Sequence, residues 1–528
     1  MKLALALAVA AVAVYCPAQE HRHGASGAAL GTVNFPVSCS PAVQADFNHA
    51  LALLHSFEYD ESQAAFLAVA KNDPGCAMAD WGAAMSHFHG LWGELENDSG
   101  ARLAATAREK AAANPKTTAR EKQYIEAASA IFGDAENFHA RAQRFSEAMA
   151  RVYESNPGDD EAAIFYALSL DESATPDPTF ANRRKCGEIL EPVFRRLPNH
   201  PGVAHYLIHC YDTDALAAKG LDAARRYARI APASAHAEHM PSHIFVRLGL
   251  WQEVVDSNIA SMDAAEKDAS ASPCERRGNE MHAMHFLQFG YLQQGRLKAA
   301  REIAMRARSL PAGKGDCYVT PDYVAASFAL DAHDWEFARQ VKPGGERDGL
   351  TWTALGIASA RSGDLTRARE AEKALAAERE VVAKDSPRGP RNSAEVNRLE
   401  VAAWIAEQEG DHARAADLMR EAAALHDELS WSAWEMPPAR EMLADLLLLQ
   451  GQSEEALAEY RAVLQKSTNL FNAVYGIARS ADAAGDQELA LAYYRRLAEL
   501  GGNGDRPEVQ AARRRVAGGS ASGSGGGW

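Results

Sequence analysis

The chain has 528 residues, of which 47% are hydrophobic and 24% charged, and its formal net charge is −16. This is the composition of a globular protein with ample apolar material for a core. No run of five or more Lys/Arg residues occurs, and a surface this negative would repel a phosphate backbone. We therefore predict no nucleic-acid partner.

The N-terminus is typical of a secretory signal. Lys2 precedes an apolar stretch, residues 3–15, that is too short to span a bilayer. Cleavage after Ala18 would place the small residues Cys16 and Ala18 at positions −3 and −1 of the cleavage site. We expect residues 1–18 to be a signal peptide, the rest of the chain not to insert into a membrane, and the protein to be periplasmic or secreted. Residues 19–34 are predicted to be a flexible segment and residues 516–528 a disordered Gly/Ser tail.

Between these ends the chain repeats itself. Gly451 and Gly485 lie 34 residues apart, and each precedes a helical pattern with a small and an aromatic residue four positions apart. A 34-residue repeat of this form is typical of the tetratricopeptide repeat (TPR), a hairpin of two helices whose apolar face is buried by stacking on its neighbours. The small and aromatic residues are Ala456 with Tyr460 and Ala490 with Tyr494.

Alternating runs rich in Val, Ile and Thr are scarce, so the fold class predicted is all-α: a TPR-like α-solenoid of stacked antiparallel helical hairpins. Weaker copies of the repeat lie further toward the N-terminus and drift in spacing. We therefore predict a divergent N-terminal array over residues 35–340 and a C-terminal array over residues 341–515, stacked into a curved rod.

Signal cleavage would leave six cysteines in an oxidising compartment, which favours disulfides. First helices of neighbouring hairpins run parallel, so cysteines near their starts lie close together. This argument predicts Cys39–Cys76 and Cys274–Cys317, and a bridge across a single hairpin predicts Cys186–Cys210. The alternative is six free buried thiols.

Several short motifs resemble those of a group of exported bacterial TPR proteins of unestablished activity. They are Cys39-Ser-Pro-Ala, Leu53-Leu-His-Ser-Phe57, Asp73-Pro-Gly-Cys-Ala-Met-Ala-Asp-Trp81-Gly and His239-Met-Pro-Ser-His243. The resemblance covers the chain from about Gly31 to the mid-three-hundreds. It implies the fold and export, and it implies no reaction.

Histidines are concentrated in the N-terminal array: eight of the 18 lie between residues 200 and 285. Spacings of three or four place two rings on one helix face. Pro241 suits the first turn of a helix, so we expect His236 and His239 on the connector before it. Stacked first helices would bring these faces into one groove. The candidate metal ligands are His205, His209, His236, His239, His243, His282 and His285.

Neutral imidazole is a common ligand for zinc and copper, which are the metals this set would suit. The alternative interpretation is that the histidines are partly buried polar residues that hydrogen-bond neighbouring helices. A second candidate set lies on or beside the same helices and would line a ligand groove, with a position in the core as its alternative: Trp81, His87, Trp92, Tyr206, Tyr211 and Asp212.

The sequence contains no GxSxG, GxxxxGK[ST], GxGxxG or HExxH motif, so no catalytic residue is predicted. We expect an exported TPR scaffold that binds a protein or peptide along its concave face, rather than an enzyme. The alternative is a metal- or small-ligand-binding protein, or a metal-dependent enzyme, built on the histidines between residues 205 and 285. Oligomeric state is not predicted.

Overall fold

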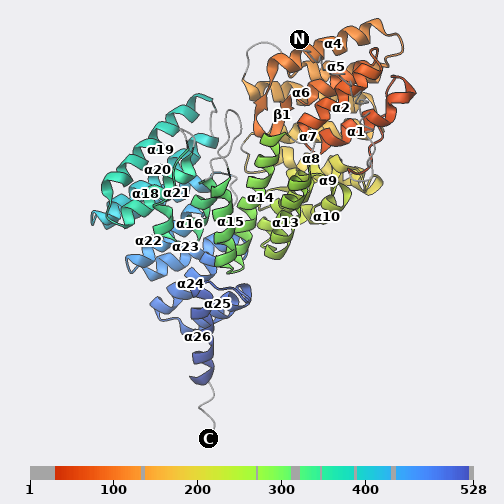
Figure 1. The fold of residues 1–528 in the computed structure, drawn as a ribbon. Coiled ribbons are helices and arrows are strands. Elements are labelled where there is room, and N and C mark those ends of the chain that lie inside the picture. The colour runs from red at the N-terminus through yellow and green to blue at the C-terminus, as the bar shows by residue number, and fades with distance from the viewer. Residues whose placement is uncertain are drawn as a thin grey trace, which may run out of the picture.

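The computed structural model describes residues 30–132, 137–175, 177–268, 272–310, 322–344, 348–385, 389–429 and 436–522. Consecutive helices pair as antiparallel hairpins that stack side by side (Figure 1). A nearly continuous buried apolar core runs along the stack. The predicted all-α, TPR-like solenoid is confirmed.

The first hairpins are α1 (Gln44–His55) with α2 (Tyr59–Asn72), α3 (Ala77–Met85) with α4 (Asn97–Ala113), α5 (Ala119–Ser129) with α6 (Phe138–Ser155), α7 (Asp160–Glu172) with α8 (Ala181–Arg196), and α9 (Pro201–Tyr211) with α10 (Ala217–Ile230). Next come α11 (Ala235–His239) and α12 (Pro241–Arg247) with α13 (Trp251–Lys267), α14 (Pro273–Gln293) with α15 (Leu297–Ser309), and α16 (Tyr323–Asp331) with α17 (Trp335–Ala338). The last are α18 (Gly349–Arg361) with α19 (Leu365–Asp385), α20 (Gly389–Gln408) with α21 (His412–Asp427), α22 (Ala439–Leu449) with α23 (Ser453–Lys466), α24 (Phe471–Ala484) with α25 (Gln487–Leu500), and α26 (Pro507–Ser522). A short 3-10 helix, η1 (Pro41–Val43), precedes α1.

The repeat residues act as their spacing predicts. Gly485 ends α24 in the left-handed conformation, with φ 85°, which an L side chain adopts only at a cost. Ala456 and Tyr460 on α23 are both buried. The ring of Tyr460 covers Gly476 of the next helix, where a Cβ atom would overlap it. The small and aromatic positions therefore fit neighbouring helices together.

One insertion interrupts the hairpin pattern between α3 and α4. It consists of β1 (Phe88–His89), η2 (Gly90–Trp92) and β2 (Glu94–Leu95), and the two strands pair antiparallel with Phe88 opposite Leu95. Trp92 lies at the tip of this insertion and is 51% exposed. The sequence analysis did not predict the insertion, because two-residue strands leave no periodic pattern to detect.

The curvature of the stack brings helices that are distant in the chain together. Helix α1 lies against α9, the first helix of the fifth hairpin and four hairpins later in the chain. At the other end, Trp251 donates from its indole nitrogen to the carbonyl of Asn469 (3.1 Å), and Arg506 donates from its backbone N–H to Gly295 (2.9 Å). Figure 1 shows the green helices α13–α15 between two stacks of helices, the orange and yellow N-terminal stack and the cyan and blue C-terminal stack. Among the described residues, no helix combines the length and apolarity needed to cross a bilayer.

Two of the predicted disulfides are present. Cys39 is bonded to Cys76, with Cα atoms 4.9 Å apart, and Cys186 to Cys210, with Cα atoms 5.8 Å apart. The predicted partner of Cys274, Cys317, lies outside the described residues.

Both predicted ends of the arrays shift. Residues 30–34 were expected to be flexible, yet Leu30 and Val33 are buried and the Thr32 N–H donates to the carbonyl of Asn199 (2.9 Å). Helix α26 continues to Ser522, beyond the predicted start of the tail at residue 516.

Candidate metal centre

Six of the seven predicted histidine ligands gather in two groups of three. Cluster 1 is His205, His209 and His236, and cluster 2 is His239, His243 and His282. Within each cluster, one ring nitrogen from every histidine lies within 4.8 Å of the others. The histidines come from the first helices of successive hairpins, α9, α11, α12 and α14, as stacking predicts.

Cluster 1 forms where α9 meets α11. His205 and His209 are one turn apart on α9, and the Nε2 atom of His205 lies 3.0 Å from that of His209 and 3.1 Å from that of His236. The Nδ1 atom of His205 is 2.7 Å from the carbonyl oxygen of His55, which only accepts, so Nδ1 carries the hydrogen. The Nε2 lone pair of neutral His205 therefore points toward the other two rings.

Cluster 2 is more tightly specified. The Nε2 atoms of His239 and His243 face each other at 3.0 Å. The Nδ1 of His239 donates to the side-chain oxygen of Asn258 (2.7 Å), whose amide nitrogen is held by the carbonyl of Val254 (2.7 Å). The Nδ1 of His243 donates to the carboxylate of Asp212 (3.1 Å). With the hydrogen on Nδ1, the neutral form of either ring presents an Nε2 lone pair to the other.

Two facing lone pairs at this distance repel each other unless a cation lies between them. A proton can bridge two nitrogens, but a third ring, His282, brings its nitrogen to the same place. Convergence of three imidazole nitrogens, with the opposite nitrogens of His239 and His243 fixed by hydrogen bonds, is the arrangement of a transition-metal site.

The charge state of the rings also suits a metal. Burial, reinforced by neighbouring imidazoles, lowers the pKa of His205, His209, His236 and His239 well below its ordinary value, and that of His282 to about 3. These rings are neutral at pH 7, and neutral imidazole is the form that ligates metal ions.

Asp212 is the group that orients His243. Its other carboxylate oxygen accepts from the guanidinium of Arg247 (2.5 Å), which also contacts Asp214 (2.8 Å). Burial acts to raise the pKa of Asp212, but Arg247 and His243 hold that pKa well below its usual range. Asp212 is therefore an ionised acceptor that fixes the tautomer of His243.

Replacing Asp212 with asparagine is expected to weaken metal binding at cluster 2 by roughly 10- to 100-fold, because hydrogen-bond partners of metal-bound histidines contribute that much. Competition with a chromophoric chelator measures the affinity of each cluster. Asp214→Asn is the matched control, since Asp214 contacts Arg247 and no cluster histidine. Equal affinities in the two variants would contradict this role for Asp212.

The seventh predicted ligand is not in a cluster. The Nε2 atom of His285 forms a hydrogen bond with the hydroxyl of Ser327 (2.9 Å), and its ring packs against Tyr323. Three residues after His282 on α14, it is rotated toward α16. His236, expected on a connector, lies in the short helix α11, whereas Pro241 does begin α12 as predicted.

Most of the predicted groove residues are buried. Trp81, Tyr206 and Tyr211 are at most 2% exposed and belong to the core, so they do not line an open groove. First helices of a TPR-like stack are covered on most sides, so an aromatic residue there is enclosed. His87 is buried and bonded to Glu96 (2.7 Å) outside both clusters. Trp92 is exposed and Asp212 lies beside cluster 2, as described above.

Sequence reasoning missed Phe57, whose ring contacts all three histidines of cluster 1. Its ring centroid lies 4.3 Å from that of His205, 5.7 Å from His209 and 5.6 Å from His236. Phe57 has φ 59°, a left-handed conformation that is unusual for a bulky side chain. Neither this conformation nor the distant contact has a periodic signal in the sequence.

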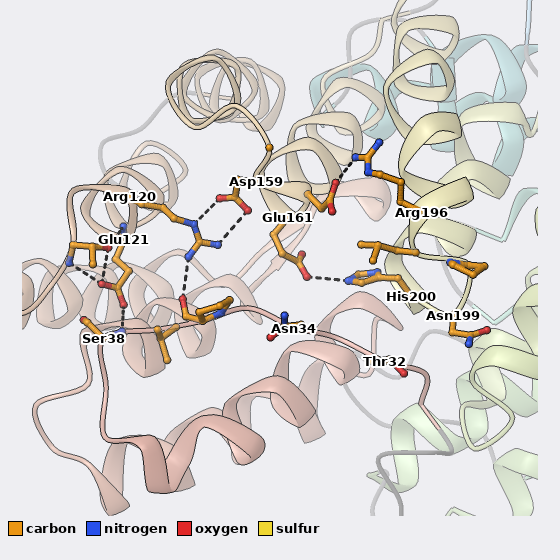
Figure 2. Close-up of a pocket in the computed structure, with 17 residues that line it drawn as sticks. Thr32, Asn34, Ser38, Arg120, Glu121, Asp159, Glu161, Arg196, Asn199 and His200 are labelled. Carbon is orange, nitrogen blue, oxygen red and sulfur yellow. Dashed lines mark hydrogen bonds and ion pairs between the residues drawn. The ribbon is translucent and has the colours of Figure 1, made fainter.

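A cavity of about 900 Å³ lies away from both clusters, between residues 32–38 and the starts of α5, α7 and α9 (Figure 2). Its charged groups are already paired: Arg120 with Asp159 (2.6 Å) and Glu161 with His200 (2.9 Å). Glu161 also accepts from His55 on α1 (3.0 Å), so this buried carboxylate ties α1, α7 and the start of α9 together. We infer that these pairs stabilise the fold and do not bind a ligand.

Known proteins with a similar sequence or structure do not identify a function for these clusters. No family model and no curated protein matches the chain in sequence. Among solved structures, it is similar to the Cut9–Hcn1 hetero-tetramer of APC/C (13% identity, 90% of this chain and 89% of that chain, TM-score 0.31). It is also similar to the human IFIT1 dimer with PPP-AAAA (13% identity, 87% and 91%, TM-score 0.38). Likenesses this weak carry no argument about function.

The chain is therefore a TPR-like α-solenoid, on the evidence of its own hairpins, and it carries two candidate three-histidine metal centres.

Proposed function

We propose that the protein binds transition-metal ions, one at each histidine cluster, with zinc or copper as the ions that suit three imidazole donors. The observation that carries this proposal is the pair of facing Nε2 atoms in cluster 2. Their partners, Asn258 and Asp212, leave both nitrogens as acceptors, and a metal ion turns this repulsion into coordination.

Adding zinc or copper to metal-free protein is expected to raise its melting temperature. An ion that binds only the folded state stabilises it by about 2.7 kcal/mol at a concentration 100 times its Kd. Magnesium is the control, because it prefers oxygen ligands and should leave the melting temperature unchanged. Equal shifts with all three ions, or no shift with zinc and copper, would contradict the proposal.

Binding of a protein or peptide along the solenoid stays a second proposal. It is supported by the fold alone, because stacked hairpins offer an extended surface for partners. The metal proposal is supported by named atoms at measured distances, and we favour it for that reason.

Export is also a proposal. The signal-like N-terminus supports it, and so do the two disulfides, since such bonds persist in oxidising compartments.

A further inference from the structure

We propose that the metal ion in cluster 1 binds an external ligand, a flat ring with a nitrogen donor, which coordinates the ion while its face stacks on Trp92. This inference rests on the proposed metal-binding function and assigns different roles to the two clusters.

Cluster 1 is partly exposed. His205 is buried, whereas His209 and His236 are half-buried. Three protein donors leave at least one coordination position of a zinc or copper ion for a further ligand. Such a ligand would approach past the half-buried rings of His209 and His236.

Trp92 stands beside this approach. Its ring centroid lies 6.0 Å from that of His236 and 5.3 Å from that of Phe57, and its side chain is 51% exposed. Among the described residues, it is the most exposed aromatic side chain. The insertion between α3 and α4 thus places an indole face next to the cluster and leaves it accessible.

Phe57 contacts both Trp92 and cluster 1. Its ring contacts the three histidines, and its backbone is held in a left-handed conformation that is unusual for a bulky side chain. A non-glycine residue persists in such a conformation only where the surrounding contacts determine it. The rings of Phe57 and Trp92 therefore form one aromatic surface beside cluster 1.

Cluster 2 lacks this arrangement. The aromatic ring that its histidines contact, Phe286, is fully buried, with centroids 4.6 Å from His239 and 4.9 Å from His243. Asn258 and Asp212 fix both of these histidines. Cluster 2 is buried to the same degree as cluster 1, but it has two fixed histidines and no exposed aromatic ring among these contacts. We therefore assign the fixed ion to cluster 2 and ligand exchange to cluster 1.

The ligand class follows from these surroundings. An exposed indole face favours flat rings, which stack on it, and imidazole-type nitrogen suits the same metals as the three histidines. Two sources present this chemistry: a free heteroaromatic molecule and the histidine side chain of a peptide.

The test uses the full chain carrying His243→Ala, so that cobalt(II) loads cluster 1 alone. Imidazole is expected to change the visible cobalt spectrum, and adding Trp92→Ala should weaken imidazole binding about tenfold. Trp92→Phe should retain most of the affinity. Methylamine, a nitrogen donor without a ring, should bind both forms equally. Trp335→Ala, a tryptophan in α17, is the matched control and should change nothing.

Imidazole that binds the Trp92→Ala form as tightly as the parent would overturn the inference while leaving metal binding intact. A His243→Ala chain that takes up no cobalt would overturn metal binding at cluster 1, and this inference with it. A blocked peptide with a single histidine, compared with free imidazole, identifies the source. Tighter binding of the peptide supports a histidine side chain, and tighter binding of imidazole supports a free molecule.

Discussion

Replacing His239 with alanine is expected to reduce the bound zinc or copper from two ions per chain to one. The substitution removes one of the two facing nitrogens of cluster 2 and leaves only His243 and His282, which cannot hold an ion against a competing chelator. Elemental analysis after dialysis against a mild chelator measures the ratio. Cluster 1 uses other rings and should keep its ion.

His285→Ala is the matched control for this experiment. His285 is also a buried histidine, and burial also lowers its pKa to about 3, but its ring bonds Ser327 outside the clusters. The control should keep two ions per chain. Retention of two ions by His239→Ala, or loss of one from His285→Ala, would contradict the assignment of cluster 2.

Replacing Glu161 with glutamine is expected to lower the free energy of unfolding at pH 7 by roughly 1.5–3 kcal/mol, because a neutral amide replaces a buried carboxylate that accepts hydrogen bonds. Glu161 accepts from both His55 and His200, and all three side chains are buried. Glutamine keeps the volume but loses the charge. Chemical denaturation measures the difference.

The same pair predicts a pH dependence. Burial acts to raise the pKa of Glu161, but His200 and His55 lower it far below its ordinary value of 4.5. A carboxylate with a depressed folded pKa contributes its full stability above its unfolded pKa and loses that contribution as the pH falls toward the folded value. The difference between wild type and Glu161→Gln should therefore be constant above about pH 5 and shrink below pH 4.

Asp160→Asn is the control for both measurements. Asp160 is the neighbouring residue, and its ion pair with Arg196 lies at the surface, where such pairs contribute about 0–1 kcal/mol. If Glu161→Gln were as stable as Asp160→Asn, the buried carboxylate would not hold α1, α7 and α9 together.

The fold was predictable because its signal is local. The glycine, small and aromatic positions of one repeat recur in the next, as Gly451, Ala456 and Tyr460 do. Each position has a known role in the turn or in helix packing. Stacking of first helices then brought distant cysteines together correctly, as in Cys39–Cys76. The same reasoning placed His205 and His209 beside His236.

Other features depend on geometry that accumulates over many repeats. Whether α1 meets α9 depends on small rotations between hairpins, which a single sequence does not specify. The hydrogen bond from His205 to the carbonyl of His55 therefore could not be predicted, and neither could the contacts of Phe57 with cluster 1. His285 was misassigned because a spacing of three residues from His282 shows only that the two side chains lie on roughly the same side of the helix. It does not show which neighbouring helix each side chain contacts.

X-ray absorption spectroscopy of the zinc- or copper-loaded chain tests the central claim most directly. Two three-histidine sites predict a first shell dominated by nitrogen at roughly 2.0–2.1 Å, with the multiple-scattering pattern of about three imidazole rings per ion. A first shell of oxygen without imidazole scattering, or one unchanged by combining His209→Ala with His239→Ala, would contradict the two metal centres.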